Sequence, residues 1–250
     1  MKRASKALVL VVSAAMLLST ITVSAATGGK TILTLEEAKK IALENDVQYE
    51  LQEDYIQEAL EDYNDLRDDT TYSRSNTSVG KISARIASKL ALESAYDKVE
   101  LEQFTKNDLK RASDYDVTTK YYSVMKARNA LDDAKRNMEL SRKDLEIGKI
   151  QLSLGLITQT TLSQLENAYK ASQTTYNSAN SDFENAMSSL SKEIGQELKT
   201  AEYDVDMTIY MPATANLSLE TLKADYIKNN SSFFNISNAL DLYEYKRLEV

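Results

Sequence analysis

The apolar residues between Val117 and Ile194 follow a seven-residue repeat on two arms that meet at a short turn. Such a repeat keeps its stripe on one face only when two helices are slightly under-wound around each other. The pattern therefore predicts an antiparallel coiled-coil hairpin. The large positions are Val117, Val124, Leu131, Met138, Leu145 and Leu152 on the first arm, and Leu162, Tyr169, Tyr176, Phe183 and Leu190 on the second.

A second column, three places further on, is mostly small. It holds Ala127, Ala134, Ser141, Gly148 and Gly155 on the first arm, and Leu165, Ser172, Ala179 and Ala186 on the second. Small residues in a seam let two helix backbones approach closely. We therefore expect a tight hairpin with its turn at residues 154–160, where Gly155 permits the reversal.

Upstream of the hairpin, a capping box opens the first expected helix. Thr34 can cap the helix and Glu37 lies three places on, so a helix is expected from Leu35 to about Leu66, bent near Asn45 and Asp46. The polar stretch 67–80 has no helical stripe and is expected to be a loop.

Helical periodicity then continues without Gly or Pro from Lys81 until Gly148, which predicts one helix over 81–154, followed by a helix over 160–194 that Gly195 ends. The two shorter helices should stack end to end along the long one. Residues 203–210 alternate polar and apolar side chains and predict a short extended segment. The chain has only 6 Gly and 1 Pro, so the expected fold class is all-α, with long antiparallel coiled-coil helical hairpins.

The opening pattern returns near the end of the chain. Leu217, Leu219 and Glu220 repeat Leu33, Leu35 and Glu36 at an offset of 184 positions, and the same offset matches Lys223 with Lys39 and Asn229 with Asn45. This indicates an internal duplication. The expected organisation is a signal peptide at 1–25, a linker at 26–33, a first repeat at 34–200, an extended linker at 201–216 and the start of a second, incomplete repeat at 217–250.

The first residues have the three parts of a secretory signal peptide. Lys2, Arg3 and Lys6 precede an apolar run over 7–18, and small residues at 23–26 supply a cleavage site. Removing the three basic residues takes the formal net charge from −8 to −11. An exported, acidic chain is thus expected, and its charge argues against nucleic acid as a partner.

The chain contains no Cys, His or Trp. It therefore lacks the commonest general base, the thiol nucleophile and the usual transition-metal ligands, and also a lipid-acceptor cysteine. The acidic residues Asp132, Asp133, Glu139 and Asp144 alternate with basic ones at helical spacing, as solvated ion pairs do. We therefore expect that the protein is not an enzyme, that it has no catalytic residue and that it binds neither a metal nor a cofactor. The basic column Arg128, Lys135, Arg142 and Lys149 could face an acidic neighbour or simply be wet surface.

Taken in order, four stretches resemble the TolC-type outer membrane efflux protein family. They are Thr34–Asn45, Lys120–Met125, the turn Leu154–Thr158 and Leu190–Gly195. The resemblance implies a trimeric tube of packed hairpins that serves as the exit duct of an export pump, with a periplasmic adaptor docked on the hairpin turns. It assigns adaptor contact to Leu154, Gly155, Leu156, Ile157 and Thr158.

Two departures narrow what the resemblance implies. The family places membrane strands where this chain has only the loop 67–80, which is too short for two strands of about 10 residues each. The family also often has an acid shortly after the turn, where this chain has Thr161. We therefore expect a TolC-like component without clear β-barrel strands. Its location would be the cell envelope or extracellular side, with the outer membrane suggested by the resemblance alone.

The expected partners are other copies of the chain, as a trimer or hexamer, and an adaptor or an ABC- or RND-type exporter. An exported coiled-coil spacer or surface scaffold without a transport role remains the alternative. An adaptor would have Gly- and Val-rich β domains beside its hairpin, and neither flank has that composition. For the turn itself, exposed Leu156 and Ile157 would mark a contact surface, whereas inward-facing ones would staple the hairpin to itself.

Overall fold

A computed structural model describes residues 29–68, 78–209 and 218–248. The expected signal peptide, most of the loop over 67–80, Leu217 and the end of the extended segment at Tyr210 lie outside these residues. In chain order, the elements are β1 (Thr31–Leu33), α1 (Leu35–Asn45), α2 (Val47–Asp68), α3 (Ser78–Ser153), α4 (Gln159–Ile194), β2 (Tyr203–Val205), α5 (Leu219–Asn229) and α6 (Ser231–Leu248).

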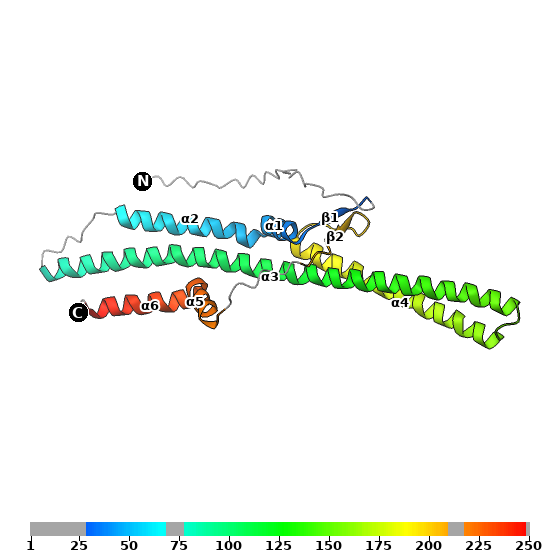
Figure 1. Cartoon of the computed structure of the whole chain (residues 1–250). Helices are drawn as coiled ribbons and strands as arrows, with labels where there is room; N and C mark the ends of the chain where they lie inside the picture. Colours follow the sequence, from blue (N-terminus) through cyan, green and yellow to red (C-terminus); the bar gives the residue numbers. More distant parts are fainter. Residues whose placement is uncertain (1–28, 69–77, 210–217, 249–250) are drawn as a thin grey trace.

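The long helix α3 is the axis of the molecule, as expected. Figure 1 shows α4 folded back along its C-terminal half, while α1 and α2 lie along its N-terminal half. The α1–α2 segment and α4 thus lie one after the other along α3, as the sequence predicted. The described chain is all-α apart from the two three-residue strands, which confirms the expected fold class.

The seam between α3 and α4 uses the predicted heptad columns. Val117, Val124, Leu131 and Leu145 are buried on α3, and Leu162, Phe183 and Leu190 are buried on α4. In the small column Ala134 and Gly148 are buried as well. Most of the free energy that holds the hairpin closed comes from removing this apolar stripe from water, because the outward faces of both arms are mainly polar.

The expected bend in the first helix is a complete break. Thr34 and Glu37 form the predicted capping box, and α1 ends at Asn45 because Asp46 has an extended backbone (φ −83°, ψ 100°). The Asp46 carboxylate then accepts hydrogen bonds from the backbone N–H groups of Gln48 and Tyr49, at 2.9 and 3.3 Å. One acidic side chain therefore starts α2 directly after α1 has stopped.

Strand β1 lies where the sequence indicated only a linker. Thr31–Leu33 pairs in parallel with Tyr203–Val205, in the register Thr31 with Tyr203 and Leu33 with Val205. The pairing joins the segment before α1 to the segment after α4. Together with α1, the end of α4 and the middle of α3, it encloses the main core of the described chain.

Tyr121 fastens this small sheet to α3. Its hydroxyl is buried and donates to the carbonyl oxygens of Leu33 at 2.7 Å and Asp206 at 3.0 Å. Burial, followed by the nearby charge of Asp206, raises the pKa of the Tyr121 phenol well above its ordinary value, so it remains a donor at any physiological pH.

Replacing Tyr121 by phenylalanine is expected to lower the free energy of unfolding by about 1–2 kcal/mol. The ring still fills its site, but the Asp206 carbonyl loses its donor, while the Leu33 carbonyl keeps the N–H of Asp206. Urea unfolding followed by circular dichroism measures the loss. Tyr122→Phe is the control, because Tyr122 is exposed beside it. Equal stability of Tyr121→Phe and the wild type would contradict the clamp.

The second copy of the opening pattern also forms two helices with a break. Ser218 caps α5, whose backbone N–H at Thr221 donates to the Ser218 hydroxyl, and Asn230 is extended between α5 and α6. The pair docks on the N-terminal half of α3 through few contacts, among them a hydrogen bond from Ser231 to Asp108 and the rings of Phe104 and Phe234 at 4.6 Å.

Candidate functional site at the hairpin tip

The five residues between α3 and α4 form a defined turn. The backbone N–H of Gly155 donates to the Leu152 carbonyl at 2.9 Å, and that of Leu156 donates to the Gln151 carbonyl at 2.8 Å. With Gly155 in the left-handed conformation (φ 72°), this is the Schellman ending of a helix. The tip is therefore fixed by its own backbone hydrogen bonds.

Thr158 closes the turn from the other side. It is the N-cap of α4, and its hydroxyl accepts the backbone N–H of Thr161 at 3.2 Å. The Thr161 hydroxyl lies 3.0 Å from the same oxygen. Thr161 thus takes part in capping α4, at the position where proteins of the TolC type often have an acidic residue.

The apolar residues of the turn divide into two roles. Leu154 and Leu156 are 67% and 69% exposed, whereas Ile157 is partly buried. The Ile157 Cδ1 atom lies 3.8 Å from the place that a Cβ on Gly148 would occupy, so Ile157 folds back toward the seam. The stapling interpretation therefore fits Ile157, and the contact-surface interpretation fits Leu154 and Leu156.

Replacing Gly155 by alanine is expected to lower the free energy of unfolding by about 1 kcal/mol. No atom lies within 4 Å of an added Cβ, so the cost comes from the left-handed backbone alone. Gly155→Asn should cost less, because asparagine tolerates this conformation better. Thermal unfolding of both variants measures the order. A larger loss for asparagine than for alanine would show that the turn is not held in this conformation.

A second apolar stripe runs along α3 toward the tip on the side away from α4. Its members, Leu140, Ile147, Ile150 and Leu154, are all exposed, and they recur at intervals of seven, three and four residues. The sequence analysis missed this stripe, because the longer heptad columns of the seam include none of these residues. Their i, i+3 and i+7 spacing was the signal that could have found them.

The basic column divides along its length. Arg128 is only partly exposed; it pairs with Asp132 at 3.1 Å and Asp204 at 3.3 Å, and its guanidinium lies 5.7 Å from the ring centre of Phe183. Further toward the tip, Lys135, Arg142 and Lys149 are exposed. Arg128 thus stabilises the base of the hairpin, whereas the other three basic residues form a solvent-exposed surface nearer the tip.

No family model matches the chain, and no curated protein matches it in sequence. Within the described ranges, no helix is long and apolar enough to cross a bilayer. The same ranges contain no cluster of three or more acidic side chains with the geometry of a metal site.

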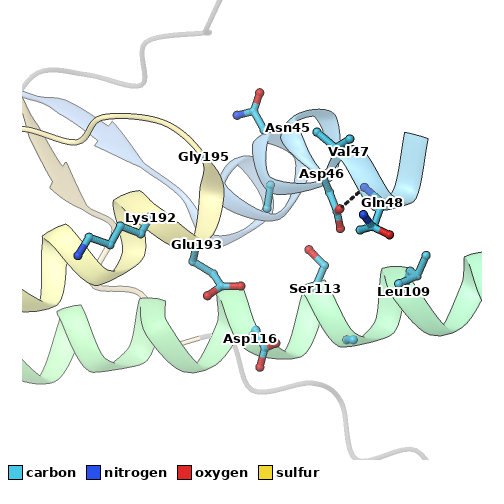
Figure 2. Close-up of a pocket in the computed structure, with 12 residues that line it drawn as sticks. Asn45, Asp46, Val47, Gln48, Leu109, Ser113, Asp116, Lys192, Glu193 and Gly195 are labelled. Atoms are coloured by element: carbon cyan, nitrogen blue, oxygen red, sulfur yellow. Dashed lines mark hydrogen bonds between the residues drawn. The ribbon is translucent and has the colours of Figure 1, made fainter. Parts of the chain in front are cut away.

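A separate hollow of about 430 Å³ lies where α1 breaks from α2. Figure 2 shows the side chains of Asp46, Ser113, Asp116 and Glu193 around it, between the break, α3 and the end of α4. The Asn45 side-chain amide donates to the Ile194 carbonyl at 2.8 Å, and Gly195, in the left-handed conformation (φ 67°), ends α4. These contacts explain the hollow as the junction of three helix ends, so we do not assign a ligand to it.

Proposed function

We propose that this chain is an exported helical component of an efflux or secretion system that docks an adaptor or exporter through its hairpin tip. The observation that carries the proposal is the exposure of Leu154 and Leu156 on a turn that is rigid by its own hydrogen bonds. Exposed apolar residues on a fixed scaffold favour a protein contact, because little side-chain or loop order has to be created on binding.

The hairpin also sets the distance at which the tip is presented. Helix α4 has 36 residues, so it holds the turn roughly 54 Å from its own C-terminal end, which lies in the core. The tip is built from α3 and α4 alone, which makes it accessible to a partner that approaches along the hairpin axis, as Figure 1 shows.

Lateral assembly into a trimer or hexamer belongs to the same proposal. The stripe Leu140, Ile147, Ile150 and Leu154 faces away from α4 and is bare, whereas the exposed face of α4 consists mostly of Ser, Thr, Asn, Gln and Ala. Large residues on one hairpin could pack against small residues on the next, as they do within the seam. Sedimentation of residues 26–250 should then give a trimer or hexamer, and a stable monomer at micromolar concentration would contradict this part.

A structural spacer remains the second candidate. The seam between α3 and α4 continues from Val117 at the hairpin base to Leu162 near the turn, and such a seam would suit a stiff rod equally well. A spacer gives no reason for two bare leucines at the turn. The two functions therefore differ in what happens when the tip alone is altered.

The test is complementation of a deletion strain. Deleting the gene should reduce export or tolerance to toxic compounds, and a copy with Leu156→Asp should fail to restore it. Leu156 is exposed at the tip and does not belong to the lateral stripe, so the variant should fold, as circular dichroism can verify, and should leave lateral packing unchanged. Asn64→Asp, on the exposed side of α2 and away from the tip and from both lateral faces of the hairpin, is the control that should restore function. An unaffected deletion strain would favour the spacer, and full restoration by the tip variant would refute tip docking.

A further inference from the structure

The pair α5–α6 has the same construction as the pair α1–α2. At the offset of 184 positions, α5 begins and ends where α1 does, and both are 11 residues long. The N-caps Thr34 and Ser218 match, and so do the extended residues Asp46 and Asn230 at the two breaks. Each residue of α5–α6 therefore has a counterpart in α1–α2 at the same place in its helix.

In α1–α2, one stripe of seven residues, beside the partly buried Ile41, faces the rest of the molecule. It consists of Leu35, Ala38, Ala42, Tyr49, Gln52, Ile56 and Ala59, of which Leu35 and Tyr49 are partly buried and the other five buried. Helix α3 covers its α2 part: Gln52 donates to the Glu102 carboxylate at 2.6 Å, and Lys106 lies over the Tyr49 ring at 5.0 Å. The stripe thus continues across the break and fits a long helix.

The equivalent stripe in α5–α6 is bare. Its seven members are Leu219, Leu222, Tyr226, Phe233, Ile236, Leu240 and Tyr243, and all are exposed. Ala38 is fully buried, whereas its counterpart Leu222 is 48% exposed, and Ile236 is 70% exposed where its counterpart Gln52 is buried. We refer to these seven residues as the α5–α6 stripe.

Helix α3 does not cover the α5–α6 stripe, because α6 meets α3 through a different side. The contacts run from Ser231 to Asp108 and from Phe234 to Phe104, and Arg111 donates to the Asn229 carbonyl at the end of α5. All the residues of α5 itself are exposed. The stripe that α1–α2 buries is therefore the one that α5–α6 leaves open.

We propose that the α5–α6 stripe is a docking surface for a further long amphipathic helix of the α3 type. The stripe spans residues 219–243, roughly 16 Å of helix on α5 and 20 Å on α6 on either side of the break at Asn230, with a large apolar side chain at each of its positions. A helix bound there would lie beside α6 and extend the existing layer of α2, α3 and α6. The inference is independent of the function proposed for the hairpin tip.

Side-chain size and charge define this partner helix. Leu222, Tyr226 and Tyr243 take the places of Ala38, Ala42 and Ala59, so the partner must present small residues where they project. The charges on α5 alternate and cancel, with Glu220 and Asp225 against Lys223 and Lys228. Because the charges beside the apolar stripe cancel, the surface favours a protein helix as its partner over an anionic polymer.

The test uses a labelled peptide of residues 84–125, which carries the face of α3 that contacts α1–α2, with Val99 and Leu109 replaced by alanine to make room for the larger side chains of the α5–α6 stripe, added to the complete chain. Fluorescence anisotropy should show saturable binding, weakened at least about tenfold by Ile236→Asp, because a charge would enter the apolar contact. Leu240→Asp should act in the same way. Asn235→Asp and Ser232→Asp lie on the exposed sides of α6 off the stripe and should leave binding unchanged.

Each other outcome contradicts the proposal. Absence of saturable binding would refute a helix-docking surface. If Ile236→Asp and Leu240→Asp left the binding unchanged, the peptide would be bound to α1–α2 in place of α3, and not to the α5–α6 stripe. A third outcome is that the peptide fails to bind but the chain floats with anionic vesicles. If Ile236→Asp abolished this flotation, the stripe would be a surface that binds lipid.

Discussion

Replacing Phe183 by alanine is expected to lower the free energy of unfolding by about 3–5 kcal/mol. Phe183 is buried on α4 in the core that unites the hairpin base with α1 and the two strands. Its ring also lies beneath the Arg128 guanidinium. Truncation removes apolar contacts, leaves a cavity between two rigid helices and takes away this cation–π contact.

Urea unfolding of residues 26–250, followed by far-ultraviolet circular dichroism, measures the loss. Asp182→Ala is the matched control, because Asp182 precedes Phe183 on the exposed side of α4 and should change stability by less than about 0.5 kcal/mol. If both variants unfolded at the same urea concentration, the seam would not hold the two arms together as the structure indicates.

Replacing Gly148 by valine is expected to cost about 3 kcal/mol, at the upper end for overpacking. Gly148 is buried in the interior of α3, and a Cβ added there would overlap Leu165 Cδ1, with Leu162 Cδ1 3.7 Å away. The small gain in helix propensity over glycine does not offset this overlap, because the Leu165 side chain would have to leave its place in the seam and the two methyl groups of valine add further volume there. The displacement would lie close to the turn and should weaken partner docking as well.

Two controls distinguish overpacking from a general effect of valine. Lys149→Val alters the next residue, which is exposed, and should change stability by less than about 0.5 kcal/mol. Leu165→Ala removes the overlapping group, so the double variant Gly148→Val, Leu165→Ala should be more stable than the sum of the two single changes predicts. Strict additivity would show that Gly148 and Leu165 do not meet.

The periodic parts of this fold were readable in the sequence because each of their signals is local or repeats. The heptad columns predicted the seam, in which Leu131 and Phe183 are both buried. The capping box at Thr34 and the terminal glycine of α4 were predicted for the same reason, since a cap depends on residues within one helical turn.

The candidate site was predicted as a segment but not in its detail. All five turn residues lie at the tip, yet only Leu154 and Leu156 combine large apolar side chains with high exposure. Ile157 turns toward Gly148, which is a property of how closely the two arms approach. The apolar stripe from Leu140 to Leu154 was missed, because the same helix carries a longer and stronger stripe on its other side.

By itself, the sequence determined the positions of the long helices, the helix caps at Thr34 and Gly195, the hairpin seam and the duplicated opening, because short-range backbone geometry and side-chain periodicity encode all of these. It indicated only a bend where the chain breaks between α1 and α2. Only the tertiary structure decided the pairing of Thr31–Leu33 with Tyr203–Val205, since each strand has three residues and gains its hydrogen bonds from a distant segment. It also decided which copy of the duplicated stripe is covered. Burial depends on what lies opposite a helix face, and the pattern along that helix cannot specify its neighbour.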